Sequence, residues 1–195
     1  MKERQIAAII LAAGGSTRFG STKQLHRYDG EPLVKRAAMA ALNAGADPVV
    51  VVLGFEADAI APAFDDIPQI RVLINPDWTK GLASSLGVGL NAIARSSDGV
   101  LVMLSDQPLV DSPALMKLIE KFDDTHRIIA SSYADTVGVP AIFGSEYVGE
   151  LSALSGDRGA GQWLRKRMPD VTTVPLEAAA IDIDTAADAA RLEEL

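Results

Sequence analysis

Short apolar runs alternate with segments of helical periodicity along most of this chain. The runs Ile6–Leu11, Val49–Leu53 and Val100–Leu104 consist of aliphatic residues and one methionine, without polar alternation. Such runs are typical of strands that are buried on both faces of a parallel sheet. In Leu33–Ala44 and Pro113–Phe122 the apolar residues recur every three or four positions. This spacing predicts two amphipathic helices, and the second would be capped by Asp111 or Ser112.

Weaker patterns complete the predicted fold. We expect further strands at Ile70–Ile74, Ile128–Tyr133, Val137–Phe143, Val171–Val174 and Ala180–Ile183. We expect further helices at Glu56–Phe64, Ser84–Arg95, Tyr147–Leu154, Gln162–Arg167 and Thr185–Leu195. The strands before and after residues 134–136 are joined by a short polar turn, which favours an antiparallel pair. Together the elements predict an α/β fold, a three-layer α/β/α domain with a mostly parallel sheet that spans residues 1–195. The last helix would be capped by Asp184 or Thr185, and its pattern leaves open whether it packs on this chain or on a neighbour.

Composition and charge exclude several classes of protein. Of the 195 residues, 48% are hydrophobic and 23% are charged, an ordinary balance for a globular protein. The net charge of −8 excludes a nonspecific nucleic-acid coat, which needs a basic face. The chain has no cysteine, which excludes disulfides, thiol nucleophiles and zinc–thiolate sites.

The apolar runs are also too short for a membrane span, which needs about 18 residues. The run Ile6–Ala13 follows Lys2 and Arg4 and is near the lower length limit of a signal peptide. We interpret it as the first strand. We therefore expect a cytoplasmic protein with no nucleic-acid or membrane partner.

A glycine-rich loop with two basic residues follows the first strand. Ligands of open α/β sheets bind outside the carboxyl ends of the strands, where this loop begins. Gly14 and Gly15 let the backbone approach a ligand and form an anion nest, while Arg18 and Lys23 add positive charge. These are the parts of a triphosphate-binding loop. It is not a P-loop, because Ser21 stands where the lysine would be, and the stretch contains no G-x-G-x-x-G.

Carboxylates follow two of the predicted strands. Asp106 lies just beyond Val100–Leu104, at the same edge of the sheet as the glycine-rich loop. Mg²⁺ prefers one or two carboxylates together with phosphate oxygens and water. Asp182 and Asp184 lie on the same side of an extended segment, and either is a candidate second ligand. Asp184 also suits a helix cap, so Asp182 is favoured. The sequence thus predicts a magnesium site among Asp106, Asp182 and Asp184.

The loop sequence L-A-A-G-G-S-T-R-F-G-S-T-K, residues 11–23, resembles the signature of the MobA-like NTP transferase family. Within that family it looks most like the molybdenum cofactor cytidylyltransferase group. Residues 81–90, 105–108, 138–143, 156–161 and 182–185 resemble further motifs, so the likeness runs nearly end to end. The resemblance implies a nucleotide-diphospho-sugar transferase-like fold with a Rossmann-like nucleotide-binding half. It implies catalytic roles for Arg18, Lys23 and Asp106. It implies that the nucleotide is bound by Leu11, Ala12, Ala13, Gly14, Gly15, Ser16, Arg18, Lys23, Gly81, Ser85 and Asp106.

The resemblance assigns the acceptor less firmly. Asp157 and Arg158 are implied as acceptor-binding residues, in a segment that resembles G-D-x-G-A-R. Gly161 stands where that motif has its arginine, and Ala186 replaces a proline of the last motif. The departure at Gly161 leaves the identity of the acceptor open.

Several other side chains have two interpretations each. The hydroxyl groups of Ser84 and Ser85 would either bond to a base edge or cap a helix. Trp78 and Trp163 would either stack on a base or a pterin or, as we favour, pack within the protein. His26 follows the loop and is expected to be structural rather than catalytic.

The family resemblance implies a Mg²⁺-dependent transfer of CMP from CTP to molybdopterin, with release of pyrophosphate. The triplet Ala12-Ala13-Gly14 looks like that of CTP users rather than GTP users. The methyl group of Ala13 would narrow the pocket around the base. Two alternatives stay open. One is transfer to another phosphorylated acceptor, such as a sugar or alcohol phosphate. The other is a catalytically silent nucleotide-binding protein that serves a molybdenum hydroxylase.

Overall fold

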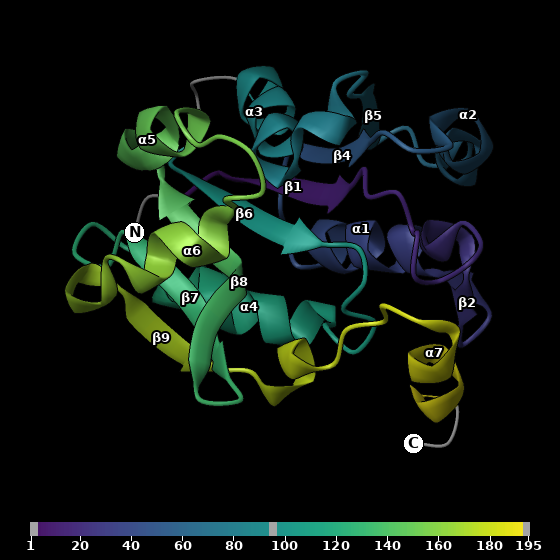
Figure 1. The fold of residues 1–195 in the computed structure, drawn as a ribbon. Helices are drawn as coiled ribbons and strands as arrows, with labels where there is room; N and C mark the ends of the chain where they lie inside the picture. Colours follow the sequence, from purple (N-terminus) through teal and green to yellow (C-terminus); the bar gives the residue numbers. More distant parts are fainter. Residues whose placement is uncertain (1–3, 94–96, 193–195) are drawn as a thin grey trace.

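A seven-stranded sheet runs through the computed structural model, which describes residues 4–93 and 97–192. The strand order is β5-β4-β1-β6-β8-β7-β9 (Figure 1). The strands are β1 (Ile6–Ala12), β4 (Val49–Leu53), β5 (Ile70–Ile74), β6 (Gly99–Leu104), β7 (Ile128–Tyr133), β8 (Thr136–Gly144) and β9 (Thr172–Pro175). Every pairing in this sheet is parallel except those that β8 makes with β6 and β7. The mostly parallel sheet and the antiparallel pair are therefore confirmed.

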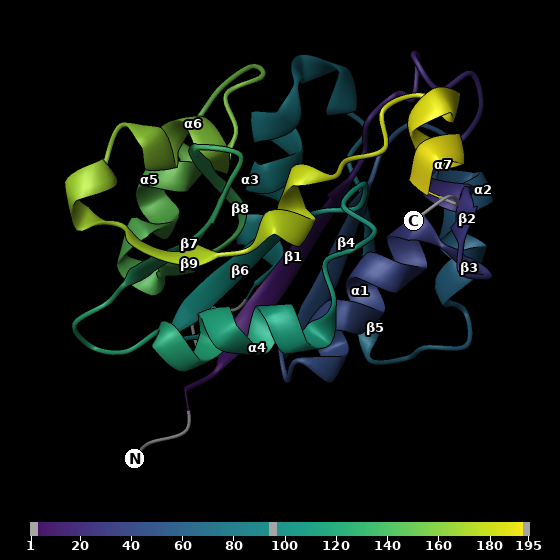
Figure 2. The same ribbon diagram turned by 90° about the horizontal axis from the view of Figure 1, so that it is seen from below.

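Helices cover both faces of the sheet. They are α1 (Leu33–Asn43), α2 (Ala57–Ile60), α3 (Leu82–Ala92), α4 (Ser112–Lys121), α5 (Val148–Ser152), α6 (Ala160–Arg165) and α7 (Ala186–Leu192). Figures 1 and 2 show α1 and α4 on one face and α3, α5 and α6 on the other. Alternate side chains of β1 enter the two cores: Ala8 and Ile10 pack on the α1 side, and Ile9 and Leu11 on the α3 side. The three-layer arrangement is confirmed, while a single domain over residues 1–195 stays a prediction.

Sequence order places β1 at the centre of the parallel half. The order β5-β4-β1-β6 is that of a Rossmann-like half: β4 and β5 are added on one side of β1, and β6 is then added on the other side. Ile9 of β1 aligns with Val50 of β4 and Val102 of β6. The carboxyl ends of these strands consequently meet at one edge, which is the edge that receives the glycine-rich loop and Asp106.

One predicted strand is wrong, and several predicted helices have other bounds: Glu56–Phe64 is α2 followed by a 3₁₀ turn, and the helices predicted at Tyr147–Leu154 and Gln162–Arg167 are Val148–Ser152 and Ala160–Arg165. The strand predicted at Ala180–Ile183 is wrong: a 3₁₀ turn covers Glu177–Ala180, and the next residues pair with no strand. This segment leaves the sheet after β9 and crosses its carboxyl edge, where the Ile183 N–H donates to the Asp106 carbonyl over 2.9 Å. The helix predicted at Ser84–Arg95 begins at Leu82 and ends at Ala92, and its predicted last residues, 94–95, lie outside the described residues.

The closing helix packs on its own chain. Ile183, Ala189 and Leu192 form a small core with Leu33 of α1, and Phe19 of the glycine-rich loop packs against it. Thr185 is the cap: its hydroxyl accepts from the Asp188 N–H, and the Asp188 carboxylate accepts from the Thr185 N–H. The predicted residues 193–195 of this helix lie outside the described residues. In the described ranges, 4–93 and 97–192, no helix is long and apolar enough to cross a bilayer.

Candidate active site

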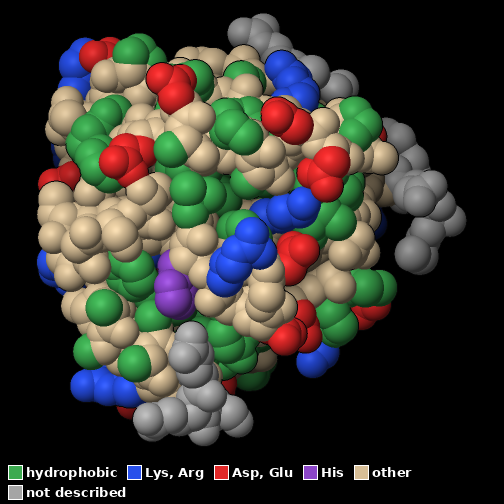
Figure 3. All heavy atoms as spheres, turned by 90° about the vertical axis from the view of Figure 1, so that its right-hand side faces the viewer, with side chains coloured by type: hydrophobic (Ala, Val, Ile, Leu, Met, Phe, Trp, Pro, Cys, Tyr) green, Lys and Arg blue, Asp and Glu red, His purple; other side chains and the backbone are tan. Residues whose placement is uncertain are grey.

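A cavity of about 380 Å³ opens at the carboxyl ends of β1 and β6. Figure 3 shows this side of the molecule, where basic and acidic side chains are interspersed rather than gathered by sign. The predicted site residues that line the cavity are Leu11, Ala12, Ala13, Gly14, Gly15, Lys23, Gly81, Ser85, Asp106 and Asp157. Ser16 and Arg18 lie on the same loop but outside this lining. A volume of this size is within the ordinary range for a small-molecule site.

Gln24 organises the glycine-rich loop from inside. Its side-chain amide is buried and donates to the carbonyl oxygens of Ala12 and Gly14, over 3.0 and 2.8 Å. Its Oε1 accepts from the Ser16 hydroxyl over 2.9 Å, and that hydroxyl in turn accepts from the Lys23 N–H. One side chain therefore fixes the loop at three points. Gln24 was not among the residues that the sequence singled out, although a glutamine beside the loop lysine was visible there.

The same bonds decide which backbone groups face a ligand. Gln24 engages carbonyl groups of the loop, whereas the N–H groups of Gly14, Gly15 and Ser16 donate to no partner within the described part of the chain. Ser16 adopts a left-handed conformation, with φ of 50°. Successive N–H groups in a loop of this kind form a concave anion-binding nest. The loop is consequently prepared for an anion such as a phosphate.

Lys23 links the loop to two carboxylates that lie far away in the sequence. Its Nζ is 2.8 Å from Asp106 Oδ2 and 3.2 Å from Asp184 Oδ1, and its side chain is only 13% exposed. Arg18 reaches the other oxygen of Asp184, at 3.0 Å. Burial lowers the pKa of Lys23, but Asp106 and Asp184 outweigh it and hold the pKa above its ordinary value. Lys23 is thus a fixed positive charge at the cavity wall.

The carboxylates fit a cation at the same place. Asp106 Oδ1 is buried and has no hydrogen-bond partner among the described residues, although a buried carboxylate oxygen ordinarily has one. Burial raises the pKa of Asp182, and the nearby charges of Asp106 and Asp184 raise it further. Within residues 4–93 and 97–192, no three acidic or histidine side chains form a complete metal-binding set. Two carboxylates completed by phosphate oxygens and water is the arrangement that Mg²⁺ prefers.

A buried asparagine, Asn75, binds two serines, and one of them, Ser85, lines the cavity. The Asn75 side-chain amide donates to the hydroxyl oxygens of Ser84 and Ser85, over 2.9 and 3.0 Å. Helix α3 begins after Gly81 with no side-chain cap, so the capping role considered for the two serines is wrong. Ser85 still lines the cavity. Trp78 also lines it, and its ring lies against Gly15, 3.1 Å from where a Cβ would be.

The segment that carries the predicted acceptor residues closes one side of the cavity. Gly81 has a φ of +101°, and a Cβ there would collide with the backbone of Gly156 and the carboxylate of Asp157. This contact holds Asp157 at the cavity. Arg158 instead turns to its own loop, where its guanidinium donates to Ser155. The structure therefore brings Asp157 to the site but not Arg158.

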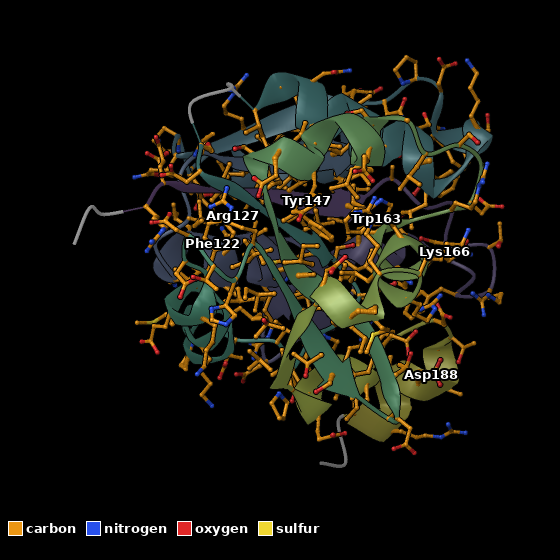
Figure 4. The ribbon with its side chains drawn as sticks, turned by 90° about the vertical axis from the view of Figure 1, so that its left-hand side faces the viewer. Phe122, Arg127, Tyr147, Trp163, Lys166 and Asp188 are labelled. Carbon is orange, nitrogen blue, oxygen red and sulfur yellow. The ribbon has the colours of Figure 1, made fainter. Side chains whose placement is uncertain are left out.

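Trp163 and His26 are not among the residues that line the cavity. Trp163 is buried, and its ring contacts those of Phe143 and Tyr147, with centroids 5.6 and 5.5 Å away, so it packs within the protein as expected. Figure 4 shows it beside Tyr147. His26 makes an edge contact with Phe19, at 5.3 Å between ring centroids, and is not a lining residue of the cavity.

Comparison with known proteins places the chain among nucleotidyltransferases. Residues 8–171 match the family model described as the MobA-like NTP transferase domain. Nicotine blue oxidoreductase of Paenarthrobacter nicotinovorans is 31% identical, over 96% of each chain. The crystal structure of Rv0371c from Mycobacterium tuberculosis H37Rv is 33% identical and superposes over all of both chains with a TM-score of 0.88.

A further similar structure bears on metal binding. Rv0371c from Mycobacterium tuberculosis H37Rv in complex with manganese is 30% identical, with a TM-score of 0.82. The match covers 97% of this chain and 98% of that one. A protein of this fold and this level of identity is thus described as a manganese complex.

Proposed function

The chain belongs to the MobA-like NTP transferase family and is a nucleotidyltransferase, and on that premise we propose that it transfers CMP from CTP to molybdopterin. The reaction releases pyrophosphate and depends on Mg²⁺. A molybdenum hydroxylase is the protein that would receive the finished cofactor. CTP and a phosphorylated acceptor are therefore the proposed substrates.

One observation carries this proposal: the glycine-rich loop presents N–H groups that have no partner among the described residues, beside a half-buried Lys23 that bridges Asp106 and Asp184. The N–H groups and the Lys23 ammonium group would hold the phosphates of a nucleotide. The carboxylates of Asp106 and Asp184 would hold the Mg²⁺ that accompanies those phosphates. A protein that only bound a nucleoside would need neither of them.

The reaction needs alignment and charge neutralisation rather than a general base. A phosphate monoester is already ionised near pH 7, so its oxygen can attack the α-phosphorus of CTP directly. The bond from the α-phosphorus to the oxygen that bridges to the β-phosphorus breaks, and its electron pair leaves with pyrophosphate. Lys23 and Arg18 neutralise charge on that leaving group, and the N–H groups of Gly14, Gly15 and Ser16 orient the phosphates.

Asp106 and Asp184 would hold Mg²⁺, because both lie against the Lys23 ammonium group. Asp184 thus replaces Asp182, which the sequence favoured, although Asp182 lies near enough for its pKa to be raised by both of them. When bound, the ion polarises the phosphate oxygens and neutralises their charge. The similarity of this chain to a structure described as a manganese complex supports an ion of this kind. Asp106 Oδ1, which has no hydrogen-bond partner in the part of the chain that the structure describes, supports Asp106 as the principal ligand of the ion.

The test is pyrophosphate release with Mg²⁺, measured for CTP and GTP and for molybdopterin against a panel of sugar and alcohol phosphates. We expect release with CTP and molybdopterin. Asp106→Ala should lower the rate at least about 100-fold, because it removes a charge that acts in the transition state. Asp170→Ala is a matched control, since Asp170 is exposed and makes none of the salt bridges of the described residues.

Other outcomes would replace parts of the proposal. Release with CTP and a different phosphate would keep the chemistry and change the acceptor. Near-normal activity of Asp106→Ala would contradict the metal assignment. Because one relative is named as an oxidoreductase, the oxidation of NADH and NADPH is measured in parallel. Oxidation without any pyrophosphate release would refute the proposed reaction.

A further inference from the structure

A second cavity, of about 240 Å³, adjoins the first. The two share four lining residues, which are Leu11, Leu82, Leu104 and Asp157. The second cavity continues over an aliphatic floor of Val102, Val139 and Ala160. A molecule that fills it would therefore touch whatever occupies the nucleotide cavity, and it would present apolar or flat surface to these side chains.

Helix α6 contributes a positive charge, Arg165, to the lining of this second cavity. Arg165 lines it, and its side chain makes no hydrogen bond or salt bridge with any described residue. The arginine two positions later differs, because Arg167 is paired with Glu150. The helix itself is anchored: Leu164 is fully buried, and Trp163 lies against Tyr147 (Figure 4). The guanidinium is thus carried by a fixed element and is available to a ligand.

The position of the Arg165 guanidinium bears on the glycine at position 161, where the resembling motif has arginine. A Cβ on Gly161, one turn earlier in α6, would lie 3.6 Å from Arg165 Nη1, and apart from the adjoining residues and the helix's own backbone it would meet no other heavy atom of the described residues within 4 Å. The guanidinium of Arg165 therefore occupies the space above Gly161. Gly161 stands where the resembling motif has arginine, so the positive charge reaches the same region from the next turn of the helix.

We propose that the second cavity is the acceptor subsite and that Arg165 binds an anionic group of the acceptor there. This inference rests on the proposed function and narrows its substrate class. The acceptor is a phosphate ester with a flat or apolar body, because aliphatic walls favour such a body over a polyhydroxylated sugar. Arginine suits the anionic group, because its planar fork of N–H donors matches phosphate and carboxylate oxygens.

The test is calorimetric titration of phenyl phosphate and glucose 1-phosphate into the full chain. The protein is first saturated with a non-hydrolysable CTP analogue and Mg²⁺. We expect phenyl phosphate to bind more tightly than glucose 1-phosphate. Arg165→Gln should weaken phenyl phosphate about 10- to 100-fold, the usual effect of losing a hydrogen bond to a charged group. The affinity for the CTP analogue should be unchanged.

Two further variants separate ligand binding from a structural role. Lys166→Gln removes a neighbouring exposed charge from the end of the same helix and should leave phenyl phosphate binding unchanged. The double variant G161R/R165Q supplies the guanidinium from position 161 in place of position 165. It should recover most of the affinity for phenyl phosphate. A helix that was merely destabilised by loss of Arg165 would not recover in this way.

The outcomes of the two titrations are distinguishable. Failure of the CTP analogue to bind would refute the proposed function, and phenyl phosphate would then be titrated alone to test Arg165. Equal phenyl phosphate affinity in the wild type and Arg165→Gln would overturn the inference. Absence of phenyl phosphate binding to the wild type, or tighter binding of glucose 1-phosphate, would overturn it as well.

Discussion

Replacement of Gln24 by leucine tests whether the loop is built by a single buried amide. Leucine is similar in volume but makes no hydrogen bond. The variant loses three bonds, to the Ala12 carbonyl, the Gly14 carbonyl and the Ser16 hydroxyl. The loop backbone would then lack the contacts that hold its carbonyl groups inward and its N–H groups toward the cavity.

The size of the effect follows from those bonds. Each buried hydrogen bond contributes about 0.5–1.5 kcal/mol, and an unpaired carbonyl adds a desolvation cost. Burial of the leucine methyl groups offsets about 1 kcal/mol of this loss. We therefore expect the free energy of unfolding to fall by about 2–3 kcal/mol. For a chain of this length the Tm should fall by roughly 5–10 °C.

Thermal unfolding and nucleotide titration together are the assay. CTP affinity should fall about 10-fold, which corresponds to 1.4 kcal/mol of binding free energy. Gln69→Leu is the matched control, because Gln69 is exposed and its amide makes no hydrogen bond to a described residue. A Tm within about 1 °C of the wild type, together with unchanged CTP affinity, would refute the role given to Gln24.

Three further predictions address the base pocket, an ion pair and a close contact. Ala13→Gly should shift the ratio of kcat/KM for CTP and GTP toward GTP, and an unchanged ratio would count against a base pocket narrowed by the Ala13 methyl. Glu146→Gln breaks the two-point bond to Arg127, whose guanidinium holds the pKa of Glu146 below its usual range. A lowered pKa stabilises the fold above about pH 4.5 and ceases to do so as pH falls through the folded value. The variant should therefore lose stability at pH 7, by less than about 1 kcal/mol since Glu146 is 44% exposed, and the loss should be smaller at pH 3. Urea unfolding at both pH values measures this, and an equal loss at pH 3 would exclude the ion pair as the cause. Gly54→Ala would place a Cβ 2.5 Å from Trp78 Cβ, so backbone must shift, and the variant should lose about 1–3 kcal/mol with weaker CTP binding. Unaltered stability would show that Trp78 moves freely.

Local sequence patterns predicted most of the fold, because buried hydrophobic runs and helix caps depend on residues that are close together in the chain. The valine-rich strand Val49–Leu53 has the predicted bounds, since a run buried on both faces admits few alternatives. Asp111 caps α4 as its position suggested, with its carboxylate accepting from the Ala114 N–H over 2.9 Å. Ala180–Ile183 has the same apolar alternation as a strand but no neighbour to pair with. The pattern of one segment cannot report whether a partner strand is available.

The sequence predicted the motifs of the site but not which of its charged side chains pair with one another. Lys23, Asp106 and Asp184 could each be named from the sequence, but which aspartate would share the lysine depends on how the chain crosses the sheet edge. Gln24 was missed because its function is to bond backbone groups, which leave no mark on the pattern. Arg165 was missed because its guanidinium acts one helical turn away from its own position, over Gly161.

The bridge from Lys23 to Asp184 joins residues 161 positions apart, and this separation sets the order of events during synthesis. The glycine-rich loop, the four parallel strands β5, β4, β1 and β6, and Asp106 are synthesised before Asp184. Asp184 and the helix that packs on Phe19 emerge last. A nascent chain therefore completes its central sheet before it can complete its charge cluster. Nucleotide binding with the final geometry therefore requires the last residues of the described chain, and a chain interrupted before Asp184 lacks one member of the charge cluster.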